Sequence, residues 1–117
     1  MKNNLEMEKS KVFIVVEIIE YIPNSVVIKT ILQKTTGNIS AVSFDSGESF
    51  AQKISPFDTF IQVIEGKAEI IIDSVSNQLS TGQSITIPAH TKNMIKANER
   101  FKMISTVIKS GYENIAL

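Results

Sequence analysis

The sequence predicts an all-β fold, built as an antiparallel barrel or sandwich with a short N-terminal extension. From residue 12 onward, short runs rich in Ile, Val, Thr and Phe recur along the chain, and these residues suit a pleated, half-buried strand surface. Turn-forming stretches such as TTGN, DSGES and STGQ separate the runs. Short strands with turns roughly every ten residues are typical of antiparallel sandwiches and barrels.

Length and charge indicate one globular domain that does not bind nucleic acid. The chain has 117 residues, which is within the usual range for a domain with one hydrophobic core. Lysine and arginine number 12, and aspartate and glutamate also number 12, so the formal net charge is zero. Because nucleic-acid and acidic-membrane surfaces need a basic excess, we expect neither as a partner.

The absence of cysteine excludes disulfides, thiolate chemistry and zinc-cysteine sites. The most apolar early run, VFIVVEIIEY, is interrupted by Glu17 and Glu20 and is too short to span a bilayer. No pattern typical of a secretory signal is present. We therefore expect a cytoplasmic protein.

The elements can be predicted in chain order. Residues 1–11 are polar and charged, so we expect a flexible segment there, followed by one β-barrel domain over residues 12–117. The stretch VVEIIEY (residues 15–21) is ambiguous, because its β-branched residues favour a strand while its glutamates are spaced as on a helix. The clearest hairpin is predicted in VIEGKAEIII, with Glu65 and Gly66 in the tight turn.

Several predicted strands carry apolar side chains on both faces. In TFIQVIE (residues 59–65), each of the two alternating faces holds large apolar residues. One face would line the barrel interior, and the other needs a cover. The cover could be the N-terminal strand, a second subunit, or both.

Two stretches of the sequence resemble the two motifs of the cupins, small β-barrel proteins of jelly-roll type. They are GESFAQKISPFDTFIQVIEG (residues 47–66) and GQSITIPAHTKN (residues 82–93). The anchor residues of the motifs fall without a gap on Gly47, Gly66, Gly82 and Pro88. The resemblance covers residues 25–108 and is to short, single-domain cupins of type 2. It implies an antiparallel jelly-roll β-barrel and a homodimer formed through a barrel sheet.

The metal-binding positions of the cupin motifs hold other residues in this chain. Metal-binding cupins coordinate iron, manganese, nickel or zinc through three His and one Glu. The corresponding positions here are Lys53, Ser55, Thr59 and Asn93. Hydroxyls and amides bind transition metals weakly beside imidazole, and a protonated lysine repels a cation. We therefore expect no metal and no other cofactor.

These replaced positions are the candidate ligand-binding residues. Lys53 would place an ammonium at the pocket mouth, although an exposed, solvated lysine is the more common case. Ser55 and Thr59 could bond a ligand, although small hydroxyls in strands more often bond backbone or water. Asn93 projects inward by alignment, and its amide needs a partner such as water, one of these hydroxyls, or a ligand.

His90, the one histidine of the chain, occupies a glycine position of the second motif. It could serve as a ligand or a base, although a lone histidine in a loop is more often a surface residue. The sequence contains no phosphate-binding glycine loop, and with one histidine and no cysteine a nucleophilic triad is close to excluded. We assign no catalytic residue.

Two functions follow from the resemblance. The first is a metal-free cupin that binds a small neutral or anionic molecule at Lys53, Ser55, Thr59, Asn93 and His90, as a sensor, carrier or storage protein. The alternative is a cupin enzyme, either a metal-independent isomerase or lyase, or a weak metal-dependent oxygenase that uses His90. Cupins host many unrelated activities, so the fold does not choose between them.

Overall fold

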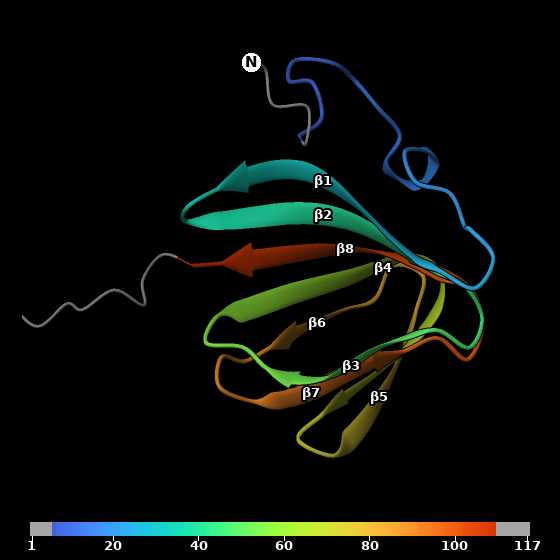
Figure 1. The fold of residues 1–117 in the computed structure, drawn as a ribbon, viewed down its shortest axis with the longest axis vertical. Helices are drawn as coiled ribbons and strands as arrows, with labels where there is room; N and C mark the ends of the chain where they lie inside the picture. Colours follow the sequence, from blue (N-terminus) through green and yellow to red (C-terminus); the bar gives the residue numbers. More distant parts are fainter. Residues whose placement is uncertain (1–5, 110–117) are drawn as a thin grey trace, which may run out of the picture.

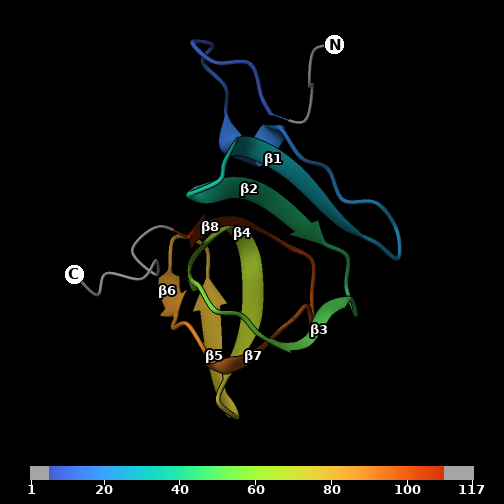
Figure 2. The same cartoon turned by 60° about the vertical axis from the view of Figure 1, so that its left-hand side comes forward.

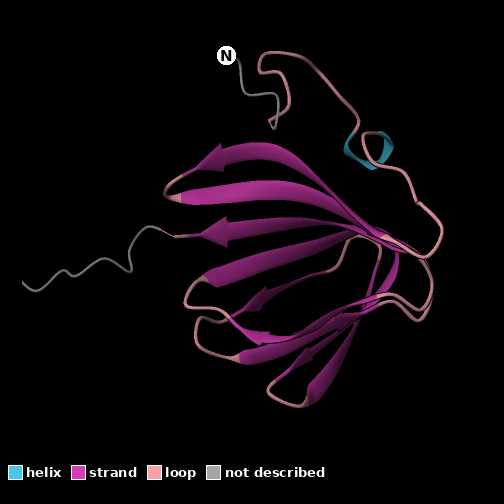
Figure 3. Ribbon diagram, in the orientation of Figure 1, coloured by secondary structure: helices cyan, strands magenta, loops and turns pink. Residues whose placement is uncertain are grey.

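The computed structural model describes residues 6–109, and Figure 1 shows their arrangement. Eight strands and one 3₁₀ turn lie within these residues. They are η1 (Val15–Glu17), β1 (Val26–Lys34), β2 (Gly37–Phe44), β3 (Ser49–Ile54), β4 (Asp58–Ile72), β5 (Val75–Ser80), β6 (Ser84–Ile87), β7 (Lys92–Lys96) and β8 (Phe101–Ile108). All strand pairs are antiparallel, and Figure 3 shows how completely strands dominate the fold. The predicted all-β antiparallel class is confirmed.

The strands form two sheets that share the long strand β4. The first half of β4 pairs with β6 and β8, and β2 and β1 continue this larger sheet beyond β8. The second half of β4 pairs with β5 and β7, and β3 completes this smaller sheet beyond β7. In Figure 1 the larger sheet lies above the smaller one, and the turned view in Figure 2 shows the two sheets facing each other.

The predicted hairpin at Glu65–Gly66 is wrong, because β4 runs through these residues without a turn. The strand register shifts between Val63 and Glu65 opposite β8, which marks a β-bulge. Gly66 has φ +84, so the positive φ expected for a turn serves a bulge that bends β4 from one sheet into the other. The tight turn follows instead at Asp73 and Ser74, where both φ values are positive, as a two-residue hairpin loop requires.

The hydrophobic core lies between the two sheets. The rings of Phe44 and Phe101 stack with centroids 4.5 Å apart, and the ring of Phe50 meets Phe44 edge-on at 4.9 Å. Around them, residues on alternating positions of β4 and β8, including Val63 and Met103, are fully buried. This packing follows from the inward-facing half of each alternating strand pattern.

The N-terminal strap, defined here as residues 12–25, covers part of the outer face of the larger sheet. Lys102 Nζ donates a hydrogen bond to the Val16 carbonyl (2.8 Å), and Ser43 Oγ donates to the Glu20 carbonyl (2.8 Å). Ile19, within the strap, is buried. These two carbonyls accept hydrogen bonds from side chains of the sheet, so they are not free for the backbone pairing of a strand or an α-helix. Residues 15–21, which were ambiguous in the sequence, accordingly form neither, and contain only the three-residue turn η1.

A polar cluster fastens the end of the strap. The Tyr21 hydroxyl donates to Glu65 Oε2 (2.6 Å), and Lys102 Nζ lies 5.0 Å from the centroid of the Tyr21 ring. Burial, together with the hydrogen bond to Glu65, raises the pKa of Tyr21 above its ordinary value. The strap therefore supplies part of the cover that the sequence requires for the outer face.

Residues near the start of the chain contact the edge strand β1. The Met7 amide donates to the Ile31 carbonyl (3.3 Å), and Glu6 Oε2 accepts from the Gln33 amide (2.6 Å). Residues 1–5 of the predicted flexible segment lie outside the described residues, and the domain division at residue 12 stays a prediction. Within residues 6–109, no helix is both long and apolar enough to cross a bilayer.

We expect Asp45 to contribute to stability against acid. Its carboxylate accepts hydrogen bonds from Arg100 Nε (2.8 Å) and the Asn24 amide (2.7 Å). These bonds, and the one from Arg100 most strongly, lower the pKa of Asp45 from 3.8 to about 2. A carboxyl group whose pKa is lower in the folded than in the unfolded protein stabilises the fold when the pH is above the unfolded value. This contribution is lost as the pH falls from 3.8 toward 2.

The test is denaturant unfolding at several pH values between about 2 and 5. The Asp45→Asn variant should lose less stability over this range than the wild type. Asp73→Asn is the matched control, because it removes one exposed carboxylate from a different turn. Identical pH dependence in the wild type and in Asp45→Asn would contradict the assignment.

Candidate binding site at Asn93

Asn93 lies in the interior of the fold, as predicted. It is on β7, between β3 and β4, with Lys53 and Ile72 as its direct cross-strand neighbours. Its alternation with the buried Ile95 places it on the inward face of the smaller sheet, and it is only 3 % exposed. A primary amide is therefore enclosed among largely apolar residues.

The Asn93 side chain is only half satisfied. Its Nδ2 donates to the Thr91 carbonyl (3.1 Å) and to the Lys53 carbonyl (3.4 Å). Because only the NH₂ group can donate to two carbonyls, these bonds fix the orientation of the amide. Its buried Oδ1 has no hydrogen-bond partner among the described residues. A buried acceptor without a hydrogen bond lowers the stability of the fold by about 1–3 kcal/mol, so a donor that reached Oδ1 would be bound favourably.

Lys53 lies beside Asn93 at the margin of the core. The two residues are directly opposite each other in the β3–β7 ladder, so their side chains share one face of the sheet. The Lys53 ammonium lies 5.5 Å from the centroid of the Phe50 ring, and Phe50 packs against the core. Lys53 is exposed, so a solvated positive charge stands next to the buried amide.

Thr59 faces the interior from the other sheet. It is half-buried on β4, directly opposite the buried Ile87 and two residues before the buried Ile61. Strand alternation therefore places its hydroxyl on the inward face of the larger sheet. Thr59 and Asn93 lie on the inward faces of the two sheets.

Ser55 and His90 are joined through their backbones at neighbouring turns. The His90 amide donates to the Ser55 carbonyl (2.6 Å), while Ser55 Oγ accepts from the Phe57 amide (3.2 Å). The Ser55 hydroxyl is thus engaged in its own turn. His90 is exposed with φ +62, and this left-handed backbone explains why the corresponding motif position is ordinarily glycine.

A hydrogen bond that could not be predicted from the sequence connects the two turns that hold Ser55 and His90. Asp58 Oδ1 accepts a hydrogen bond from the Ala89 amide (2.7 Å), which joins the start of β4 to the turn before β7. The structure therefore places Lys53 beside Asn93 and joins Ser55 to His90. The roles of all five candidate residues in binding stay predictions.

The donor set does not favour a metal. Within residues 6–109, no group of three or more His, Cys, Asp or Glu side chains is arranged to hold a metal ion. The amide, hydroxyl and ammonium groups of the interior positions are poor ligands for transition metals beside imidazole. The expected absence of a bound metal stays a prediction.

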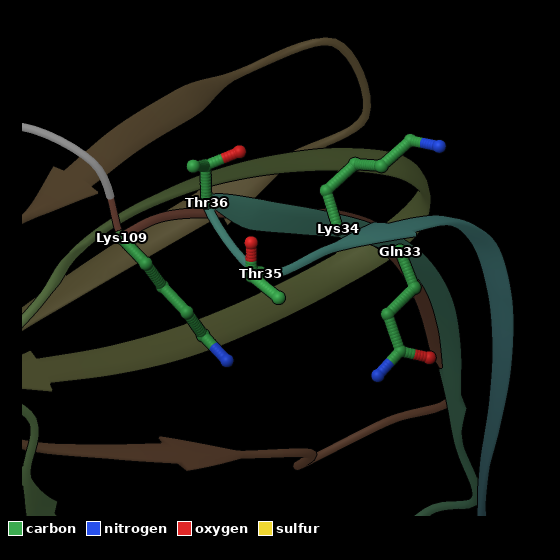
Figure 4. A pocket seen from close by; sticks show the side chains of 5 residues that line it. All are labelled: Gln33, Lys34, Thr35, Thr36 and Lys109. Carbon is green, nitrogen blue, oxygen red and sulfur yellow. The ribbon is translucent and has the colours of Figure 1, made fainter.

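A separate hollow lies at the turn between β1 and β2. It has a volume of about 710 Å³ and is lined by Gln33, Lys34, Thr35, Thr36 and Lys109. Figure 4 shows that the ammonium groups of Lys34 and Lys109 point away from each other. Because its charged groups do not converge, this hollow is a weaker candidate than the interior site.

Comparison with known proteins identifies relatives by structure. No protein-family model and no curated protein matches the sequence. A conserved protein of unknown function from Streptococcus pyogenes has a similar structure, with a TM-score of 0.84 and 28% identity over 93% of this chain and 96% of that one.

Two further solved structures carry the cupin description. A cupin superfamily protein from Desulfitobacterium hafniense has a TM-score of 0.79 and 25% identity, over 92% of this chain and 98% of that one. A cupin 2 conserved barrel domain protein from Leptotrichia buccalis has a TM-score of 0.77 and 26% identity, over 80% of this chain and 46% of that one. With its antiparallel jelly-roll fold and these structural neighbours, the chain is a member of the cupin superfamily.

Proposed function

We propose that this cupin binds a small neutral or anionic molecule in its barrel interior, without a metal, as a cytoplasmic sensor, carrier or storage protein. The observation that supports the proposal best is the unpartnered Oδ1 of Asn93. Buried polar atoms are nearly always hydrogen-bonded, so an acceptor left without a donor is a place where a ligand gains a bond that the free protein lacks.

The surroundings of Asn93 limit the chemistry of the ligand. Its Oδ1 needs an O–H or N–H donor, because the two N–H bonds of the amide are already used. The neighbouring Lys53 ammonium disfavours a cation and favours a carboxylate or a neutral polar group. Ile72 and Phe50 offer apolar contact nearby. A small hydroxylated molecule, such as a sugar or a hydroxy acid, fits these requirements.

A thermal-shift panel of sugars, carboxylates and amines tests the proposed ligand class. We expect a hydroxylated neutral or anionic compound to raise the melting temperature most, and Lys53→Ala to reduce the shift given by anionic compounds. Lys67→Ala is the matched control, because it removes an exposed lysine from β4 and should preserve the shift. If cationic amines stabilise most, and equally in all three proteins, the electrostatic assignment is wrong.

Elemental analysis of untagged protein separates this proposal from a metal-dependent enzyme. We expect well below one transition metal per chain, because the interior offers an amide, a hydroxyl and an ammonium. Close to one metal per chain, lost in His90→Ala or Asn93→Ala, would favour the oxygenase alternative and overturn the proposed binding function.

A further inference from the structure

A row of three hydroxyl groups crosses the inner face of the larger sheet. Thr30 on β1, Ser40 on β2 and Ser105 on β8 are direct cross-strand partners in one register. Ser40 alternates along β2 with the core residue Val42, and Ser105 alternates along β8 with the core residue Met103. Because alternate residues of a strand share a face, the hydroxyl row lies on the face that looks toward the smaller sheet.

The hydroxyl groups of the row have no hydrogen-bond partner within the part of the chain that the structure describes. All three residues are half-buried, and none of their side chains bonds another group among residues 6–109. Ser43, on the outer face of β2, shows the usual arrangement, because its Oγ donates to the Glu20 carbonyl (2.8 Å). The row therefore keeps its donors and acceptors free for a molecule that enters the interior.

The row faces the buried amide of Asn93 from the opposite sheet. β7 and β8 belong to different sheets and are joined at residues 97–100 (Figure 1). Counted from this connection, Asn93 lies just beyond the core residue Ile95, and Ser105 lies just beyond the core residue Met103. Both side chains therefore occupy the end of the interior that is remote from the connection. The unpartnered Oδ1 of Asn93, in a residue only 3 % exposed, and the hydroxyl row border the same space.

The two sides of this space differ in charge. The hydroxyl row is uncharged, and each hydroxyl can both donate and accept a hydrogen bond. On the other side, the Lys53 ammonium next to Asn93 favours an anionic group. Directly opposed residues on neighbouring strands are about 4.5–5.5 Å apart at Cβ, so one ligand hydroxyl cannot reach the whole row. Full use of the row requires a ligand with several hydroxyl groups.

We propose that the interior ligand is a polyhydroxylated carboxylate of the sugar-acid class. Its hydroxyl groups bind Thr30, Ser40 and Ser105, a further hydroxyl donates to Asn93 Oδ1, and its carboxylate lies toward Lys53. This assignment rests on the proposed function and narrows it, since a molecule with one hydroxyl group would satisfy Asn93 but leave the row unused. The three added binding residues lie outside both cupin motifs of the sequence.

Thermal unfolding of the free protein tests whether the row has a structural role instead. Ser40→Ala and Ser105→Ala should leave the melting temperature nearly unchanged, because no hydrogen bond within the protein is lost. Ser43→Ala is the matched control on β2, and it should lower the melting temperature, because its bond to the Glu20 carbonyl is lost. Losses in Ser40→Ala and Ser105→Ala as large as that in Ser43→Ala would overturn the proposal.

NMR titration of the full chain with a matched ligand series tests the ligand class. Gluconate, 2-hydroxyhexanoate and hexanoate share their carbon number and charge but differ in their number of hydroxyl groups. We expect gluconate to bind most tightly, and Ser40→Ala and Ser105→Ala each to weaken its binding about three- to tenfold, as for one neutral hydrogen bond. Thr106→Val is the matched control: it removes a half-buried hydroxyl from the outer face of β8 and should leave the affinity unchanged.

The outcomes separate this proposal from the function on which it rests. The sugar-acid class is wrong if gluconate binds no more tightly than 2-hydroxyhexanoate or hexanoate, or if Ser40→Ala and Ser105→Ala bind it as the wild type does. In either case, weaker binding of the carboxylates to Lys53→Ala would still support the interior site. Carboxylate binding that is independent of Lys53 would contradict the proposed function as well. If none of the three compounds binds, the sugar-acid class is overturned, and the thermal-shift panel decides the proposed function.

Discussion

Gly66→Ala should lower the free energy of unfolding by about 3–5 kcal/mol, combining backbone strain with a steric clash. Gly66 has φ +84, a conformation that a residue with a Cβ adopts only with strain. A Cβ at this position would also meet the Arg100 carbonyl oxygen, and it would lie 3.1 Å from the Cα and Cβ of Phe101. Backbone atoms of β8 cannot move aside cheaply, because β8 is paired with strands on both sides.

Gly82→Ala is the matched control for this prediction. Gly82 has φ +89, almost the same as Gly66, but a Cβ there would have no neighbouring atom within 4 Å. Gly82→Ala should therefore lower the free energy of unfolding only by the cost of backbone strain, about 1 kcal/mol. Denaturant unfolding of the two variants gives the comparison. Equal losses would mean that Gly66 is needed only for its positive φ, and that the close approach of β4 to β8 is unimportant.

Asn93→Asp should lower the free energy of unfolding by about 3–5 kcal/mol at neutral pH, because the exposed Lys53 ammonium is screened by solvent and offsets only a small part of the cost of a buried charge. The substitution preserves the shape of the side chain but replaces the Nδ2 donor by a second acceptor. The carbonyls of Thr91 and Lys53 would lose their donor, and a carboxylate would stand in a site that is 3 % exposed. Burial disfavours the charged form most strongly.

Asn77→Asp separates the lost hydrogen bonds from the buried charge. The Asn77 Nδ2 also donates to two carbonyls, those of Ile70 and Val75, each at 3.1 Å. Asn77 is only half-buried, so its replacement should cost less, about 1–2 kcal/mol. Equal losses at the two positions would show that water reaches the interior around Asn93.

The pH dependence of Asn93→Asp has a definite sign. A buried carboxyl has a folded-state pKa above its unfolded value of about 3.9, so the folded variant binds more protons between the two values. Relative to the wild type, the stability of the variant is then highest at low pH and falls as the pH rises. Denaturant unfolding of the variant and the wild type at about pH 4 and pH 7 gives the difference in their free energies of unfolding. We expect this difference to be larger at pH 7. A difference independent of pH would contradict the account.

Much of the fold could be predicted because it depends on local sequence. Strand residues, turn residues and the motif glycines identify the antiparallel jelly roll before any contact is known. The path of β4 could not be predicted in this way. A positive φ at Gly66 is compatible with either a tight turn or a bulge, and the pairing with β8, far along the chain, decides between them. The conformation of the strap could not be predicted for the same reason. Its turn is held by a hydrogen bond to the Val16 carbonyl from Lys102, which lies 86 residues later in the chain.

The candidate site could be predicted only in part. The inward position of Asn93 follows from strand alternation within the second motif, and the structure places it there. Its missing partner could not be predicted, because it depends on which carbonyls lie next to Nδ2 after β3 and β7 pair across an irregular register between Phe50 and Lys53. The engagement of the Ser55 hydroxyl in a turn is likewise a three-dimensional result.

A crystal structure of the protein with the compound that stabilises it most in the thermal-shift panel tests the central claim most directly. The account predicts an O–H or N–H donor of that compound about 2.7–3.2 Å from Asn93 Oδ1, with any anionic group on the side of Lys53. The contrary result is equally clear. If the compound binds elsewhere and Asn93 Oδ1 faces only ordered water, the interior of this cupin is not its binding site.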